Sequence, residues 1–263
     1  MPESDYELAK IIEYIRSHWP SRAEWQVSLD DYKILAGKAL AELTAGKTKS
    51  REMMRIAGLS GSGKTSQLLP AAEAYFENKN LVPVVVAARV FVKYHPHFDE
   101  ILAAHGEENL RKETDEFATI MLFMILKALI AAGYDFILDV TLLDPKMEEI
   151  LVQMLEAGNY KMSFLMIAAS PEVTGRFLQK REWRHSAETE KEFVRATEIA
   201  MGFYAKRCPN VRLVLWNVYG LEPVYDGKFK DGLEVFKKYS SETEIPEHDK
   251  DEMRTAKINY LKR

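Results

Sequence analysis

The chain has 263 residues, of which 47% are hydrophobic and 29% are charged, as is ordinary for a globular protein. Its net charge of −4 gives no support to a protein that binds nucleic acid through electrostatic attraction. The single cysteine, Cys208, excludes a disulfide within the chain and a cysteine metal cluster. Since the sequence shows no leader and no apolar run of about 18 residues, we expect a cytoplasmic protein with no membrane partner.

Two helices are expected before the first strand. Apolar residues at helical spacing predict one helix over residues 5–19. A second helix is expected to begin near Ser28 or Asp30, either of which can cap it, and to reach Leu43. We interpret residues 1–50 as an N-terminal helical extension, which either packs on the core that follows or offers a surface to a partner.

The next stretch, Gly58 to Thr65, reads Gly-Leu-Ser-Gly-Ser-Gly-Lys-Thr and fits the pattern G-x-x-x-x-G-K-[ST]. An apolar run precedes it and residues 66–76 follow with helical spacing, which is the strand–turn–helix context that the motif requires. The glycines let backbone N–H groups point at phosphate oxygens, and the start of the helix adds partial positive charge. Lys64 is expected to reach the β- and γ-phosphates, and Thr65 to place its hydroxyl on Mg²⁺.

These features predict a nucleotide triphosphate site that uses ATP or GTP together with Mg²⁺. The pattern does not distinguish adenine from guanine. The residues expected to contact the nucleotide are Gly58, Ser60, Gly61, Ser62, Gly63, Lys64, Thr65 and Ser66.

Strands and helices alternate after this loop. Further strands are expected over residues 81–88, 134–140, 161–168 and 211–216, with helices over 107–132, 145–157, from Pro171 onward, and 188–206. Residues 221–245 are polar and turn-rich, with room for a short pair of strands, and a final charged helix is expected over 247–261. The alternation predicts an α/β fold, a parallel sheet with helices on both faces. The predicted domains are the extension (1–50), a P-loop nucleotide-binding kinase core (51–220), and a C-terminal polar segment with a helix packed on the core (221–263).

Ligands of open parallel sheets bind beyond the carboxyl ends of the strands. Besides the P-loop, the residues expected at those ends are Arg89, Asp139, Thr141, Ser170 and Asn217. Asp139 follows an apolar run and can hold Mg²⁺ or orient a substrate hydroxyl; the alternative is a strand-end residue without a ligand.

Two arginines follow Pro171 on one helical edge. Arg181 and Arg184 stand at i and i+3, where they can clamp a transferring phosphate or form a solvated basic face. His95 and His97 suggest a metal site, but no further histidine or cysteine stands at ligand spacing. We therefore expect no metal besides the Mg²⁺ of the nucleotide.

From about residue 38 to residue 220 the chain resembles the zeta toxin family, which are P-loop kinases of bacterial toxin–antitoxin systems. The matching features are Gly61-Ser62-Gly63-Lys64-Thr65, His95-Pro96-His97-Phe98 for the family's H-P-x-[FY] segment, and Gly133-Tyr134 before the strand that leads to Thr141. The helix from Pro171 to Arg181 matches the one that carries the family's first phosphate-binding arginine.

The resemblance implies an α/β P-loop kinase that transfers the γ-phosphate of ATP to a hydroxyl of UDP-N-acetylglucosamine and is held by a small antitoxin. Lys64 and Arg181 would keep catalytic phosphate contacts, with Arg184 as the candidate second arginine. Thr141 would keep its role in the substrate site. His95 and Arg89, which stand in the segment that resembles the family's H-P region, would also belong to that site.

The acceptor half of the site departs from the family. Arg89 stands where the family has its catalytic aspartate, and an arginine cannot act as a general base in a protein. The glutamate of the family's E-G-T is Asp139, and the arginine two residues after the threonine is Leu143.

Three interpretations follow from these departures. The first is a kinase with a changed acceptor that uses Asp139 or Asp99 as base. The second is a pseudo-kinase that binds the nucleotide without transfer, with Arg89 filling the acceptor pocket. The third is a P-loop NTPase or small-molecule kinase of another family.

Overall fold

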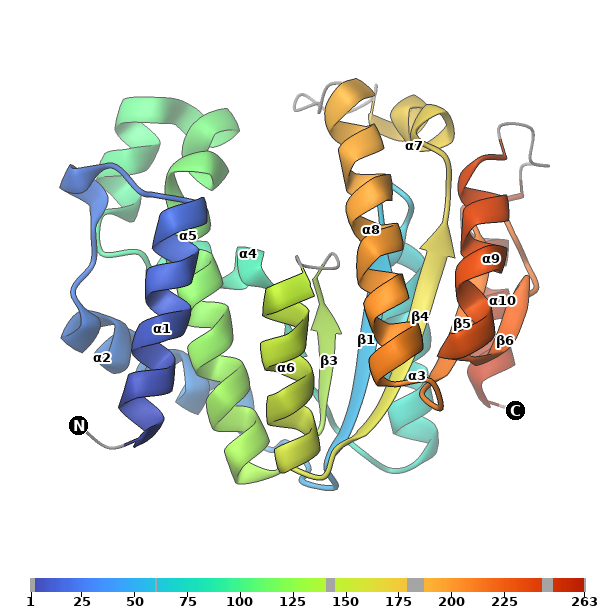
Figure 1. Ribbon diagram of the computed structural model, residues 1–263, viewed down its shortest axis with the longest axis horizontal. Coiled ribbons are helices and arrows are strands. Elements are labelled where there is room, and N and C mark those ends of the chain that lie inside the picture. Colours follow the sequence, from blue (N-terminus) through green and yellow to red (C-terminus); the bar gives the residue numbers. More distant parts are fainter. Residues whose placement is uncertain (1–2, 60, 141–144, 179–186, 243–247, 263) are drawn as a thin grey trace. The chain divides into compact units, whose positions relative to one another are not determined.

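A computed structural model describes residues 3–59, 61–140, 145–178, 187–242 and 248–262 (Figure 1). It forms two compact units, one of residues 1–46 and 86–132 and the other of residues 47–85 and 133–263. The predicted domain boundaries at residues 50 and 220 follow the order of the chain instead, and they stay a prediction.

The second unit is built on a six-stranded sheet in the order β2-β3-β1-β4-β5-β6. The strands are β1 (Glu52–Gly58), β2 (Val84–Val86), β3 (Phe136–Asp139), β4 (Lys161–Ala168), β5 (Arg212–Asn217) and β6 (Tyr225–Lys228). Strand β1 pairs in parallel with β3 and β4, β4 pairs in parallel with β5, and β6 is antiparallel to β5. The predicted α/β fold with a mainly parallel sheet is therefore confirmed.

Helices cover both faces of this sheet. In Figure 1, α6 (Pro145–Ala157), α8 (Ala187–Arg207) and α9 (Phe229–Ser240) lie in front of the strands, and α3 (Leu69–Asn78) and α10 (Lys250–Lys262) lie behind. Successive residues of a strand point to opposite faces. On β4, Leu165 therefore packs in the cluster of α3 and α10, while Phe164 packs in that of α8 and α9.

The helix α9 is longer than the other elements that the sequence did not predict, η1, α4 and η3. Residues 221–245 read as turn-rich, but they contain β6 and a helix whose buried stripe includes Phe229, Gly232 and Phe236. A Cβ at Gly232 would lie 2.3 Å from the Leu213 Cδ2 atom, so the helix approaches β5 as closely as its backbone allows. Phe229, Leu233 and Phe236 stand at helical spacing, so the sequence carried the signal of this helix, which the turn-rich interpretation of the segment overlooked.

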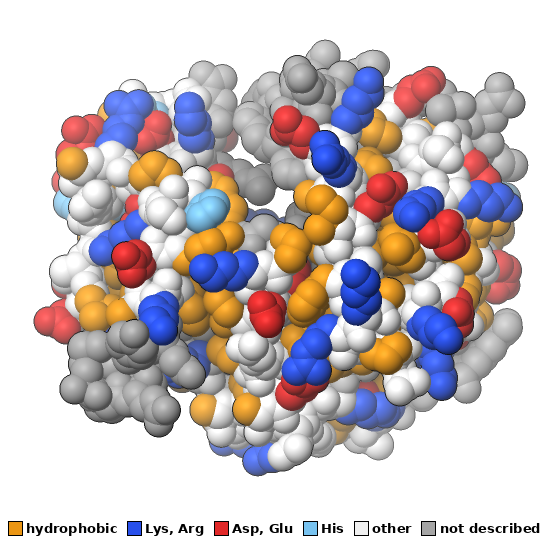
Figure 2. Space-filling view, viewed as in Figure 1, with side chains coloured by type: hydrophobic (Ala, Val, Ile, Leu, Met, Phe, Trp, Pro, Cys, Tyr) orange, Lys and Arg blue, Asp and Glu red, His pale blue; other side chains and the backbone are white. Residues whose placement is uncertain are grey.

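The outer side of the front helices carries mixed charge. In the space-filling view, blue and red side chains are interspersed over α6 and α8 (Figure 2). Among the described residues, no helix is long and apolar enough to cross a membrane.

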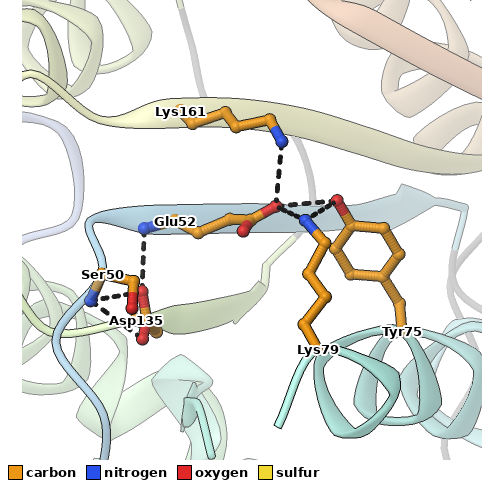
Figure 3. A network of polar contacts seen from close by, with 6 residues as sticks. All are labelled: Ser50, Glu52, Tyr75, Lys79, Asp135 and Lys161. Carbon is orange, nitrogen blue, oxygen red and sulfur yellow. Dashed lines mark hydrogen bonds and ion pairs between the residues drawn. The ribbon is translucent and has the colours of Figure 1, made fainter. Parts of the chain in front are cut away.

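One buried carboxylate fixes the amino ends of two central strands. Asp135 accepts hydrogen bonds from the backbone N–H groups of Ser50 (3.0 Å) and Glu52 (2.9 Å) (Figure 3). It also accepts one from the Thr48 hydroxyl at 2.6 Å. Its own backbone N–H donates to the Thr48 carbonyl at 2.9 Å. The segment that leads into β1 is thereby tied to the start of β3.

A second carboxylate stands beside it in Figure 3. Glu52 accepts hydrogen bonds from the Tyr75 hydroxyl at 2.7 Å and the Lys79 ammonium at 2.6 Å, and the Lys161 ammonium lies 3.6 Å away. Burial raises the pKa of Glu52, but the hydrogen bonds from Lys79 and Tyr75 outweigh it and hold that pKa below its usual value. These contacts join α3 to β1 at the end of the sheet opposite the P-loop.

The first unit is helical. It comprises α1 (Glu3–His18), η1 (Ala23–Trp25), α2 (Leu29–Thr44), α4 (Ala88–Phe91), η3 (Val92–Tyr94) and α5 (Phe98–Ala132). The strand predicted over 81–88 is wrong at both ends, because β2 spans only Val84–Val86 and Ala88 already begins a helix. The helix predicted over 107–132 begins earlier, at Phe98, and is interrupted at Gly106, whose φ of +70° is not helical.

The predicted N-terminal helices pack within this unit. Ser28 caps α2 as expected, because its side chain accepts a hydrogen bond from the backbone N–H of Asp31 at 3.2 Å. Arg16 of α1 pairs with the buried Glu116 of α5 at 3.1 Å, and Arg22 pairs with Glu113 at 2.9 Å. These contacts favour packing as the role of the extension's first helix.

Candidate functional site

The P-loop joins β1 to α3 through a loop that only glycine can close. A Cβ at Gly58 (φ +144°) would lie 2.8 Å from the Ser62 hydroxyl, and a Cβ at Gly63 (φ +98°) would lie 2.6 Å from the Gln67 amide nitrogen. After Gly63 the chain makes a π-helical turn, η2 (Lys64–Leu68), before α3 begins. Pro70 has no N–H to donate to the turn behind it, which explains why the predicted helix over 66–76 does not start as a regular α-helix.

The ammonium group of Lys64 lies over the loop. Its Nζ donates hydrogen bonds to the backbone carbonyls of Gly58 at 2.7 Å and Leu59 at 3.0 Å. Ser62 is buried, and its hydroxyl makes no hydrogen bond within the described part of the chain. The loop therefore presents a fixed positive charge with backbone N–H groups beside it, an arrangement suited to an anion.

Thr65 and Asp139 meet beside this charge. The register of β1 and β3 places Asp139 next to Ile56, so the last residue of β3 stands beside the start of the P-loop. The Thr65 hydroxyl lies 3.2 Å from Asp139 Oδ2, and Asp139 is buried. A hydroxyl and a carboxylate are the oxygen ligands that Mg²⁺ prefers.

A cation at this pair would need further oxygen ligands. Among the described residues no group of three or more histidine, cysteine or acidic side chains could hold a metal ion. Mg²⁺ usually keeps several waters and binds through one or two protein groups together with substrate phosphates. The Thr65–Asp139 pair fits that kind of shared coordination.

Only some of the other predicted site residues of the second unit lie in the described part of the chain. Gly61 lies in the loop, and the Ser66 hydroxyl lies 3.4 Å from the Gly63 carbonyl. The expected nucleotide contact Ser60, the substrate residue Thr141 and the arginines Arg181 and Arg184 lie outside the described residues. Their roles stay predictions.

Arg89 and His95 belong to the first unit. Arg89 lies on α4 and is exposed. His95 follows η3 and is buried; its Nδ1 accepts a hydrogen bond from the backbone N–H of His97 at 3.1 Å, and its ring meets Phe117 edge-on with centroids 4.6 Å apart. These contacts give His95 a packing role inside the unit, and its predicted place in a substrate site is untested.

Acid is expected to destabilise the protein through His95. Burial and the neighbouring His97 lower the pKa of His95 to about 4, below the usual 6.5. Between these values the unfolded chain takes up a proton that the folded chain does not, so stability falls as the pH falls from about 6.5 to about 4, by about 2 kcal/mol. Urea unfolding at pH 7 and pH 4.5 measures this loss. His95→Asn retains an acceptor but does not titrate, so its loss should be smaller than that of the wild type; an equal loss in both proteins would contradict the assignment.

Sequence reasoning missed two buried polar side chains near the loop. Gln67 is buried, and its side chain lies against Gly63, which stands four residues earlier in the chain. Arg55 is fully buried in β1, where the sequence was read as an apolar run. In the sequence, Arg55 is a single charged residue within the strand before the P-loop, and the P-loop context requires that strand to lie in the centre of the sheet. A charge at such a position could have indicated a buried arginine.

The sequence and the fold were compared with known proteins. The family model described as zeta toxin matches residues 39–210. No curated protein matches the sequence. Among solved structures, one from a molecular and structural characterization of the PezAT chromosomal toxin-antitoxin system of Streptococcus pneumoniae is similar with a TM-score of 0.69 and 20% identity, covering 90% of this chain and 98% of that chain.

Two further solved structures are similar. The native AvrRxo1-ORF1:ORF2 complex aligns with a TM-score of 0.51 and 14% identity, over 99% of this chain and 85% of that chain. The same complex with ATP aligns with a TM-score of 0.50 and 13% identity, over 99% of this chain and 86% of that chain. At these identities the likeness shows a shared fold.

Proposed function

Because this chain belongs to the zeta toxin family, we propose that it is an ATP-dependent phosphotransferase that moves the γ-phosphate to a hydroxyl of a small molecule. The observation that carries the proposal is the Thr65–Asp139 contact of 3.2 Å directly beside the loop that holds the Lys64 ammonium. An anion site and an oxygen pair for a cation, side by side, are what a magnesium–nucleotide complex needs.

Different residues bind the phosphates and the cation. Lys64 and the backbone N–H groups of the loop bind the β- and γ-phosphates, where negative charge develops during transfer. Thr65 and Asp139 hold Mg²⁺, and Arg181 and Arg184 contribute further positive charge to the transferring group. The AvrRxo1 complex of the same fold contains ATP, which supports adenine as the base.

The acceptor is a small molecule with a hydroxyl group, and a nucleotide sugar such as UDP-N-acetylglucosamine is the first candidate. Arg89 and Leu143 replace the aspartate and arginine that the family carries in its acceptor site. Since phosphoryl transfer depends mostly on positioning and electrostatics, losing one base slows the reaction without abolishing it. Asp99, in the first turn of α5, is the candidate base within the first unit, while Asp139 is engaged with Thr65.

A small antitoxin is the proposed protein partner. Of the similar structures, PezAT is described as a toxin-antitoxin system, and the AvrRxo1 chain was solved in complex with a second chain. We place both partners in the cytoplasm. A pull-down from the native host that recovers no small protein would contradict this part of the proposal.

A second function is favoured by Arg89. A positive side chain in place of the general base suits a nucleotide-binding pseudo-kinase, which binds ATP without transferring its phosphate. The experiment that follows separates the two functions.

Transfer is tested by mass spectrometry of the protein incubated with Mg·ATP and a panel of UDP-sugars and small hydroxyl metabolites. We expect one acceptor to gain a phosphate, and UDP-N-acetylglucosamine to react slowly because Arg89 and Leu143 have replaced the family's groups. The Lys64→Ala variant is the control and should form no product. ATP that is bound but unspent across the panel would favour the pseudo-kinase, and fast transfer to UDP-N-acetylglucosamine would show that the proposed change in the acceptor site is wrong.

A further inference from the structure

A buried lysine of the last helix contacts the turn that follows β5. Lys257 of α10 is fully buried, on a stripe that it shares with Met253 and Leu261. Its ammonium donates a hydrogen bond to the backbone carbonyl of Gly220 at 2.7 Å and lies 5.8 Å from the centre of the Trp216 ring. Both partners lie beyond residue 210, where the match to the family model ends.

Stability does not explain this lysine. Burial lowers the pKa of Lys257 to about 8, because the interior solvates the ammonium less well than water does. Within the described part of the chain no carboxylate pairs with the ammonium to offset this cost. The acceptor that the ammonium does have is the Gly220 carbonyl, so the contribution of Lys257 lies in holding this turn.

The turn over residues 217–220 is closed tightly. The Gly220 N–H donates to the Asn217 carbonyl at 3.2 Å, and a Cβ at Gly220 would lie 2.6 Å from Asn217 Oδ1. With Lys257 on the Gly220 carbonyl, both polar groups of the Gly220 backbone are bonded. The last residue of the turn is therefore fixed from the side of β5 and from the side of α10.

The register of the sheet places this turn near the P-loop. Gly58, Ile167 and Trp216 stand opposite one another on β1, β4 and β5. Neighbouring strands lie about 4.8 Å apart, so Trp216 stands about 10 Å across the sheet from the first residue of the P-loop. On the other side of β1, the proposed function gives the Thr65–Asp139 pair to the cation. We therefore expect the sugar and base over the carboxyl ends of β4 and β5.

The helix α10 also packs against the turn that follows the P-loop. It lies on η2 and α3, and its residues Met253 and Leu261 share a hydrophobic cluster with Leu68 of η2 and with Trp216. One helix thus contacts both the phosphate-binding loop's own turn and the turn after β5.

We propose that Lys257 is a positioning residue that holds the turn over residues 217–220 where the nucleoside part of the nucleotide binds, while the P-loop binds the phosphates. The inference rests on the proposed function and adds to it the residues that receive the sugar and base. A turn that is fixed before binding loses less conformational freedom when the nucleotide arrives, so it raises the affinity.

Hydrogen exchange of the wild-type protein tests where the nucleoside binds. Inorganic tripolyphosphate with Mg²⁺ is the matched ligand, because it offers the phosphates without sugar and base. We expect both ligands to slow exchange in the P-loop, and Mg·ATP alone to slow exchange over residues 217–222, by about threefold or more. Equal exchange over residues 217–222 with the two ligands would overturn the inference.

The variant Lys257→Met tests the lysine itself, since methionine keeps an unbranched side chain and removes the donor. By isothermal titration calorimetry we expect the affinity for Mg·ATP to fall about tenfold and that for Mg·tripolyphosphate to stay within about twofold of the wild type. A general loss of stability would weaken both ligands alike. The matched control Lys250→Met, at an exposed position of the same helix, should leave both affinities unchanged.

A conservative variant and the wild type complete the test. Lys257→Gln keeps an N–H donor on a shorter side chain, so its loss of affinity for Mg·ATP should be smaller than that of Lys257→Met. Equal losses of the two ligands in Lys257→Met would overturn the inference. A wild-type protein that binds neither ligand would overturn the proposed function, whereas binding of both without protection over residues 217–222 would overturn this inference alone.

Discussion

Replacing Lys64 by alanine is expected to weaken binding of Mg·ATP by at least about a hundredfold. The ammonium is fixed over the loop by the carbonyls of Gly58 and Leu59, where it can bridge two phosphate groups. Its loss removes the positive side chain of the loop and leaves only the backbone N–H groups. Isothermal titration calorimetry of the wild type and the variant measures the difference.

Two controls make this result specific. Lys206→Ala removes an exposed lysine near the end of α8 and should leave the affinity for Mg·ATP unchanged. The thermal midpoint of Lys64→Ala should stay close to that of the wild type, because Lys64 Nζ contacts the loop itself. Equal affinities of Lys64→Ala and the wild type would contradict the assignment of the P-loop.

Replacing Asp135 by alanine is expected to lower the free energy of unfolding by about 2 to 4 kcal/mol. The carboxylate is fully buried, and its removal takes the acceptor from the N–H groups of Ser50 and Glu52 (Figure 3) and from the Thr48 hydroxyl. The bond from Glu52 is buried, and the other two are partly buried. Each buried donor left unsatisfied costs about 1–3 kcal/mol. Urea unfolding followed by circular dichroism measures the loss.

Two further variants locate the cause of that loss. Asp135→Asn retains one acceptor oxygen and should lose about half as much stability. Glu77→Ala, at an exposed position of α3, should change the free energy of unfolding by no more than about 0.5 kcal/mol. A loss in Asp135→Ala as small as that of Glu77→Ala would show that the carboxylate does not hold the two strands.

The sequence was most informative where chemistry and local structure coincide. The spacing of Gly58, Gly63, Lys64 and Thr65 predicted a turn between a strand and a helix, and the structure shows why those glycines are needed. The strand predicted over 161–168 agrees with β4 in both its ends. Its continuous apolar run is typical of a parallel strand that is covered on both faces.

Other features depend on contacts between distant parts of the chain. Gly133-Tyr134 belongs to the family resemblance, but the role of the next residue, Asp135, depends on bonds from Ser50 and Glu52 that span more than 80 residues. Lys257 was read as part of a charged helix, yet it is buried, donates to the Gly220 carbonyl at 2.7 Å, and has its pKa lowered to about 8 by burial. No local pattern distinguishes such a lysine from its solvated neighbours.

The residues of the candidate site also differ in how far the sequence could predict them. The nucleotide half lies in one continuous motif, so the sequence could name its residues, and the contact with Asp139 follows from the order of strands around β1. The proposed acceptor half would draw on Arg89, His95 and Thr141, which come from separate segments of the chain. Their identities alone do not give their arrangement, and the substrate therefore stays a proposal.

We propose that the glycine loop and the Thr65–Asp139 pair form the site of a magnesium–nucleotide complex. A crystal structure of the protein with Mg²⁺ and a non-hydrolysable ATP analogue tests it most directly. We predict β- and γ-phosphate oxygens within hydrogen-bond distance of Lys64 Nζ and the loop N–H groups, with Mg²⁺ on the Thr65 hydroxyl. A nucleotide bound away from this loop would contradict the claim.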